Sequence, residues 1–201
     1  MKIAKSETVI SSKLTLMIMT ALIAAVLCVV GPLSVPIGPV PISLTMLVLF
    51  FAVYILGTGY ALVSCVIYLL IGMIGLPVFS GYQGGLAKLA GPTGGYLIGF
   101  IPMVAVAGGV ILLSGRFVSD TKKVSSLILL RVIHFVGFVV ATAVLYFFGT
   151  LWFVISTRTP VISALGLCVF PFIPGDLIKI AVAVVLGPWL AQLIKASMGQ
   201  R

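Results

Sequence analysis

Long apolar segments with almost no charge are the feature that most limits what this chain can fold into. Six of them are interpreted as membrane spans, at residues 14–33, 43–57, 59–76, 95–115, 125–149 and 173–195. A bilayer core is about 30 Å thick, and backbone groups inside it must hydrogen-bond within their own segment, which favours helices. The sequence therefore predicts an all-α integral membrane protein with six transmembrane helices, forming a single transmembrane domain over residues 1–201.

The second and third spans are separated only by the tripeptide Gly57-Thr58-Gly59. Glycine permits a tight turn, so residues 43–76 are expected to form a helical hairpin rather than one long helix. The count of six spans depends on this turn.

The composition excludes a soluble protein and orients the spans. Of all residues, 62% are apolar and 7% are charged, and the mean hydropathy is +1.37, well outside the range of soluble domains. Because basic residues gather on the cytoplasmic side, both termini are predicted there. Eight basic residues then lie inside, namely Lys2, Lys5, Lys13, Arg116, Lys122, Lys123, Lys195 and Arg201, against Lys88 and Arg158 outside. This topology explains the net charge of +9 without nucleic-acid binding.

An acid and an amine stand together near the start of the last apolar span. Asp176 and Lys179 lie three residues apart in the segment Pro171–Ile180. Either charge near the centre of a membrane helix costs about 2.5 to 3.5 kcal/mol, so two in one span indicate a function. They share a helix face, where they can pair with each other or with a polar guest. We interpret them as the polar floor of a small-molecule site.

The segment Gly75–Phe100 is the richest in special backbone chemistry. Seven glycines fall between residues 81 and 99, and glycine lets the backbone turn sharply or approach a ligand. The candidate binding residues here are Tyr82, Gln83, Gly84, Gly85, Thr93 and Tyr96. Gly94, Gly95 and Gly99 have an equally good interpretation as small residues that permit close helix packing. No phosphate-loop motif occurs, so this is not a nucleotide site.

Two further segments suggest a lid and a docking surface. Residues 31–39 contain five prolines and glycines, as expected of a fixed irregular lid over a cavity, with a plain turn as the alternative. The first span carries a step of small residues, Ala21-x-x-x-Ala25, on which another helix can lie close. Spacing alone does not say whether that helix belongs to this chain or to another protein.

The sequence shows no pattern typical of a metal site or of an enzyme active site. Cys28, Cys65 and Cys168 lie far apart without ligand spacing, so no metal site or disulfide is expected. The single His134 lies toward the opposite side from Asp176, so we predict no catalytic residue and no cofactor. Arg131 shares a helix face with His134 near the cytoplasmic start of the fifth span. It is interpreted either as an anchor to the lipid headgroups or as part of a functional site.

Three blocks give the chain a resemblance to a known family. They are Pro39-Val40-Pro41-Ile42-Ser43-Leu44, the stretch Gly75–Phe100 with its Gly91-Pro92-Thr93-Gly94-Gly95-Tyr96 core, and Pro171–Lys179, supported by Gly149-Thr150-Leu151-Trp152. From about residue 14 to residue 190 the chain resembles BioY, the substrate-binding (S) component of energy-coupling-factor (ECF) biotin transporters. One departure stands out, because Leu44 is followed by Thr45 and Met46 where the family usually continues Leu-Gln-Thr.

The resemblance implies a six-helix S-component fold in the cell membrane, with biotin bound near the outer face. Asp176 is then expected to accept the ureido N–H groups and Lys179 to donate to the ureido carbonyl, with Lys179 on the carboxylate tail as the competing arrangement. Gly84 and Gly85, with Tyr82 and Tyr96, would enclose the apolar ring.

The resemblance also implies an energy source outside this chain. ATP hydrolysis by a separate module, made of two ATPases and a transmembrane T subunit, would drive import, and Ala21 and Ala25 would dock on the T subunit. A solitary secondary carrier and an S component for another small vitamin are the alternatives. Hydropathy and the small-residue step do not distinguish biotin from thiamine or riboflavin.

Overall fold

Five long helices dominate the computed structural model, which describes residues 3–35, 40–117 and 124–197. In these ranges, five helices are long and apolar enough to cross a membrane. They are α1 (Ile3–Val30), α2 (Thr45–Met73), α4 (Gly94–Phe117), α5 (Val124–Thr157) and α7 (Ile173–Ser197). Two short helices, α3 (Leu86–Ala90) and α6 (Val161–Cys168), and two short strands, β1 (Ser34–Val35) and β2 (Ile42–Ser43), complete the described chain. The all-α membrane architecture is confirmed.

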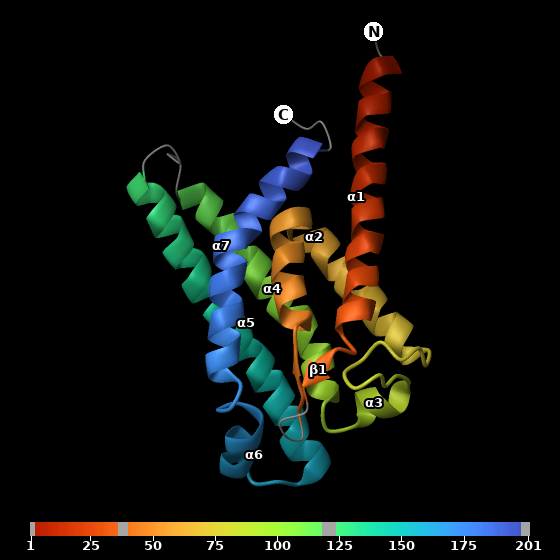
Figure 1. The fold of residues 1–201 in the computed structure, drawn as a ribbon, viewed down its shortest axis with the longest axis vertical. Helices are drawn as coiled ribbons and strands as arrows, with labels where there is room; N and C mark the ends of the chain where they lie inside the picture. Colours follow the sequence, from red (N-terminus) through yellow and green to blue (C-terminus); the bar gives the residue numbers. More distant parts are fainter. Residues whose placement is uncertain (1–2, 36–39, 118–123, 198–201) are drawn as a thin grey trace.

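The helix α2 is broken where the hairpin was predicted. Gly57 has φ 76° and ψ 172°, which are not helical angles. Figure 1 shows the two parts of α2 leaving this point in different directions. Glycine tolerates this conformation because it has no Cβ. The break divides α2 into two helical parts, while the count of six spans stays a prediction.

The connections divide between the two ends of the molecule. The first turn of α1 and the last turn of α7 lie at one end, and β1, α3 and α6 lie at the other (Figure 1). Lys88 in α3 and Arg158, between α5 and α6, belong to this second end, as the predicted topology requires. Four basic residues predicted on the cytoplasmic side, Lys2, Lys122, Lys123 and Arg201, lie outside the described residues. The orientation of the termini in the membrane therefore stays a prediction.

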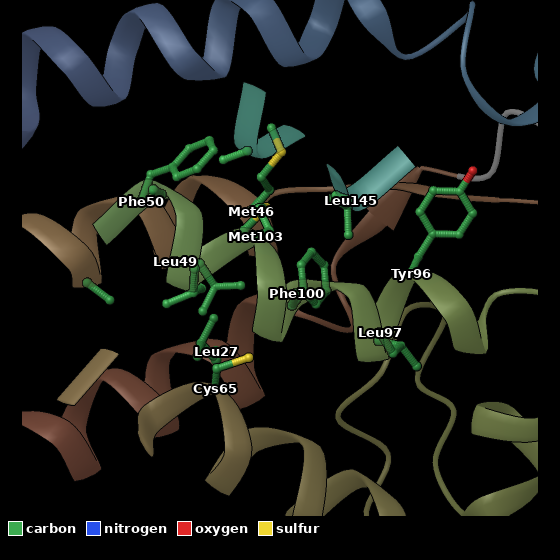
Figure 2. Packing of buried hydrophobic residues seen from close by; sticks show 14 of the residues in the cluster. Leu27, Met46, Leu49, Phe50, Cys65, Tyr96, Leu97, Phe100, Met103 and Leu145 are labelled. Carbon is green, nitrogen blue, oxygen red and sulfur yellow. The ribbon is translucent and has the colours of Figure 1, made fainter. Parts of the chain in front are cut away.

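The core is a packed cluster of apolar side chains between α1, α2, α4, α5 and α7, part of which is seen from close by in Figure 2. Leu27, Leu49 and Met103 have no exposed surface, and the rings of Phe50 and Phe138 stack with centroids 4.3 Å apart. Lipid tails are as apolar as these side chains, so the cluster stabilises the fold through close packing.

Gly94, Gly95 and Gly99 were interpreted either as ligand-binding or as helix-packing residues, and two of them serve helix packing. A Cβ on Gly95 would collide with the side chain of Trp152 in α5, and a Cβ on Gly99 would lie 3.1 Å from Leu145 Cδ1. The two residues let α4 and α5 approach closely. Gly94 instead abuts the backbone of Leu89 at the turn between α3 and α4.

The described loops at the second end are joined by hydrogen bonds into a layer, called here the loop layer, while the lid over residues 31–39 stays a prediction. Strands β1 and β2 pair antiparallel, with Ser34 opposite Ser43. The loop before α3 is tied to this ribbon because the Gly81 N–H donates to Ser34 Oγ at 3.1 Å and to Pro32 O at 3.2 Å. Residues 36–39 of the predicted lid lie outside the described residues. The strands are a small departure from a purely helical chain.

Candidate ligand-binding site

A cavity lies beneath the loop layer, between α2, α4, α5 and α7. Its floor and walls combine a few polar groups with a larger number of apolar side chains, as small-molecule sites generally do. The lining residues are Gly31, Val40, Pro41, Ile42, Ser43, Thr45, Met46, Tyr68, Ser80, Thr93, Tyr96, Leu97, Phe100, Leu145, Tyr146, Cys168, Phe172, Asp176 and Lys179.

The acid and the amine pair with each other inside this cavity. Lys179 Nζ lies 2.8 Å from Asp176 Oδ1, and Asp176 is only 8% exposed. The amine also donates to the carbonyl of Ser43, in strand β2, at 2.8 Å. Tyr146 in α5 donates its hydroxyl to the second carboxylate oxygen, Asp176 Oδ2, at 2.6 Å. Asp176 occupies the first turn of α7, where the helix dipole favours negative charge.

This pair still has hydrogen-bonding capacity for a guest. The ammonium of Lys179 has three N–H groups, of which two are used. Each oxygen of Asp176 accepts one hydrogen bond and can accept another, and the Tyr146 hydroxyl can accept as well. The site therefore offers adjacent acceptors and a charged donor to a ligand that carries both donor and acceptor groups.

Tyr96 closes another wall and joins two of the sequence blocks. Its hydroxyl donates to the Cys168 carbonyl at 3.1 Å and lies 3.2 Å from Thr150 Oγ1. Gly149 leaves room for its ring, because a Cβ there would collide with the Tyr96 ring. Trp152 Nε1 donates to the Gly91 carbonyl at 3.0 Å. The Gly91–Tyr96 and Gly149–Trp152 blocks thus hold each other in place beside the cavity.

The sequence model of the BioY family matches residues 4–196 of this chain. The chain belongs to the BioY family. A relative named biotin transporter BioY2, from Lactococcus lactis, is 33% identical over 88% of this chain and 90% of its own length. The protein named biotin transporter BioY from Thermotoga maritima is 34% identical over 83% of this chain and 90% of its own length.

The fold of this BioY chain is also similar to a solved structure. That crystal structure is described as the S-component for biotin from an ECF-type ABC transporter, and it aligns with a TM-score of 0.73 and 29% identity. The alignment covers 90% of this chain and 93% of the other. The S-component fold expected from the sequence is therefore confirmed, and its family and its apolar helices make this chain a multi-pass membrane protein.

Four of the eight binding residues predicted for this BioY chain meet at the cavity. Asp176, Lys179, Thr93 and Tyr96 all line it.

The other four predicted residues lie elsewhere. Gln83 and Gly84 line a neighbouring surface depression beside Lys88, and Tyr82 is 66% exposed on the loop before α3. Gly85, with φ 87°, precedes α3 and donates its N–H to the Gly72 carbonyl at 2.7 Å. The structure places these four outside the cavity lining.

The sequence reasoning did not identify Tyr146, Ser43 or Tyr68 as site residues. Tyr146 is one of several polar side chains in a long apolar run, and Ser43 belongs to the Pro39–Leu44 block, which was considered only for the family resemblance. Tyr68 donates its hydroxyl to the Val78 carbonyl at 3.2 Å and so ties α2 to the loop layer. Thr45, at the departure from the family pattern, lines the cavity and accepts from Ser43 Oγ at 3.2 Å.

The small-residue step of α1 faces away from the rest of the described chain. Ala21 and Ala25 are exposed, whereas the intervening Ala24 is 2% exposed and packs inward. Large apolar side chains such as Leu22 and Val26 are exposed on the same helix. Within the described residues, the step is not used for internal packing, which leaves it open to a partner or to lipid.

Proposed function

We propose that this chain captures biotin at the outer face of the cell membrane, as the substrate-specificity component of an ECF-type vitamin transporter. The observation that carries the proposal is the Asp176–Lys179 pair with Tyr146, placed in an otherwise largely apolar cavity. Membership of a family whose relatives are named biotin transporters supports it, and does not favour an enzyme.

The chemistry of biotin fits this cavity group by group. The ureido ring has two N–H donors and one carbonyl acceptor, which match the free acceptor positions of Asp176 and the remaining donor of Lys179. The apolar thiophane ring suits the wall formed by Tyr96, Leu97 and Phe100. This arrangement is preferred to one with the carboxylate tail on Lys179, because that tail would also lie beside the negative charge of Asp176.

Calorimetry of the purified protein against biotin, thiamine and riboflavin tests ligand identity. Biotin is expected to bind, and the other two vitamins are not. A second titration with biotin methyl ester tests the orientation, because an ester loses little affinity if the tail points away from Lys179. Strong binding of another vitamin in place of biotin would contradict the proposal.

Import is proposed to depend on a separate ECF module of a transmembrane T subunit and two ATPases. Ala21 and Ala25 form the docking step, since small residues let a partner helix approach closely. An Ala25→Trp variant should keep biotin affinity but lose co-purification with the module. Trp at the exposed Val26, which points about 100° away from Ala25 on the same helix, is the matched control.

Uptake in cells that lack the ATPases distinguishes this proposal from a solitary carrier. No biotin accumulation is expected there, and accumulation at the normal rate would favour the secondary-carrier alternative.

A further inference from the structure

A hydrogen bond that α7 lacks is supplied by α5. Pro188 lies inside α7 and has no N–H, so the Val184 carbonyl four residues earlier loses its helical donor. Arg131 in α5 fills this position, because its Nη1 donates to Val184 O at 2.8 Å and to Val185 O at 3.0 Å. The guanidinium thus bridges the two carbonyls at the point where the proline interrupts the helix.

The surroundings hold α7 closely at this level. Gly187, next to the proline, packs on the Tyr54 ring of α2, where a Cβ would collide. The Tyr54 hydroxyl lies 2.9 Å from His134 Nδ1, and His134 Nε2 lies 2.8 Å from Ser114 Oγ. Polar groups from α2, α4 and α5 therefore form a network in the half of the bundle away from the ligand cavity.

The same two helices meet again at the cavity. Within the described residues, α5 and α7 are joined by the Arg131 contacts and by the hydrogen bond from Tyr146 to Asp176. Asp176 and Val184 are eight residues apart on α7, or about 12 Å at the rise of an α-helix. A shift of α7 at Val184 would therefore be transmitted along a short rigid helix to the acid.

We propose that Arg131 is a positioning residue for the ligand site: by bonding the Val184 carbonyl that Pro188 leaves without a helical donor, it sets α7 against α5 and so holds Asp176 within reach of Tyr146. This inference rests on the proposed ligand binding. The alternative is that Arg131 anchors the helix to lipid headgroups. The effect of replacing an anchor would not depend on Pro188. The effect of replacing a substitute hydrogen-bond donor would, because the donor is needed only while Pro188 is present.

The test is biotin calorimetry on purified full-length variants, at a temperature where circular dichroism shows each to be folded. Arg131→Met should bind about tenfold more weakly than wild type, which corresponds to 1.4 kcal/mol. Adding Pro188→Ala restores an N–H for Val184 and should recover most of the loss. Pro102→Ala, at the proline inside α4, is the matched control and should recover nothing. Lys13→Met, an exposed cation on α1, should bind like wild type.

A second comparison separates positioning from general stability. In a Tyr146→Phe background the contact to be positioned is already gone, so Arg131→Met should cost clearly less affinity than it does in wild type. If Arg131→Met does not fold, Arg131→Lys takes its place, with the same rescue by Pro188→Ala expected.

The outcomes distinguish the two proposals. Wild-type affinity in Arg131→Met, no rescue by Pro188→Ala, equal rescue by Pro102→Ala, or an undiminished effect in the Tyr146→Phe background would overturn the positioning role alone. Failure of both wild type and Lys13→Met to bind biotin would overturn the proposed function and this inference with it.

Discussion

Replacing Asp176 by asparagine is the most direct challenge to the proposed site. The carboxylate accepts hydrogen bonds from Lys179 and from Tyr146, and both charged side chains are only 11% exposed. The asparagine keeps one acceptor for the ammonium, but it replaces the other oxygen with an NH₂ group and removes the negative charge that pairs with Lys179. Leaving a buried charge without its partner costs about 3 kcal/mol, so the variant should unfold at a clearly lower temperature.

The effect on ligand binding is expected to be large and separable from stability. A hydrogen bond to a charged group contributes about 1.5 to 3 kcal/mol, so its loss should weaken biotin binding roughly 10- to 150-fold in calorimetry. The double variant Asp176→Asn/Lys179→Met removes the stranded charge and should regain stability without regaining affinity. Undiminished biotin affinity in Asp176→Asn would refute the assignment of the acid to the ureido group.

Two smaller perturbations test the walls of the cavity. Tyr146→Phe removes one donor from Asp176 and should weaken biotin binding several-fold, about 1 kcal/mol, in the same calorimetric assay; equal binding would mean that the phenol does not shape the acid. Gly149→Ala pushes a methyl group into the Tyr96 ring and should lower stability by about 1 to 3 kcal/mol, measured by thermal unfolding. Gly166→Ala, where a Cβ meets nothing within 4 Å, is the control and should not lower the unfolding temperature.

The spans were predictable because hydropathy records which segments can lie in lipid, but it does not record where a helix ends. The fifth span was predicted over residues 125–149, whereas α5 continues to Thr157. Its additional turns carry Thr150 and Trp152, which bond Tyr96 and Gly91. The apolar residues Leu151, Phe153 and Ile155 continue the run beyond residue 149, and the span in the structure covers Ser125–Thr157.

The candidate site was predictable only at residues whose side chains are energetically unfavourable in a membrane span whatever their neighbours. Asp176 and Lys179 stand out because charge in an apolar span is expensive in any fold. Tyr146 does not, since a tyrosine in such a span is compatible with ordinary packing, and its role depends on how α5 crosses α7. The glycines before α3 indicated backbone freedom, but Gly81 and Gly85 use positive φ angles to turn the chain rather than to approach the cavity.

The ion pair between Asp176 and Lys179 explains how this bundle accommodates two charges without a ligand. Sequence spacing allowed Asp176 and Lys179 to pair with each other or with a guest, and the structure shows the first, completed by Tyr146 and the Ser43 carbonyl. A guest therefore has no stranded charge to neutralise. It must instead match the acceptor and donor positions that remain, while its apolar part fills the walls. A simple fatty acid has a carboxylate and an apolar chain but no neutral donor beside an acceptor, and its charge would lie beside Asp176. In the proposed site, the paired arrangement would thus favour a neutral cyclic urea over a carboxylate as the group that contacts Asp176 and Lys179.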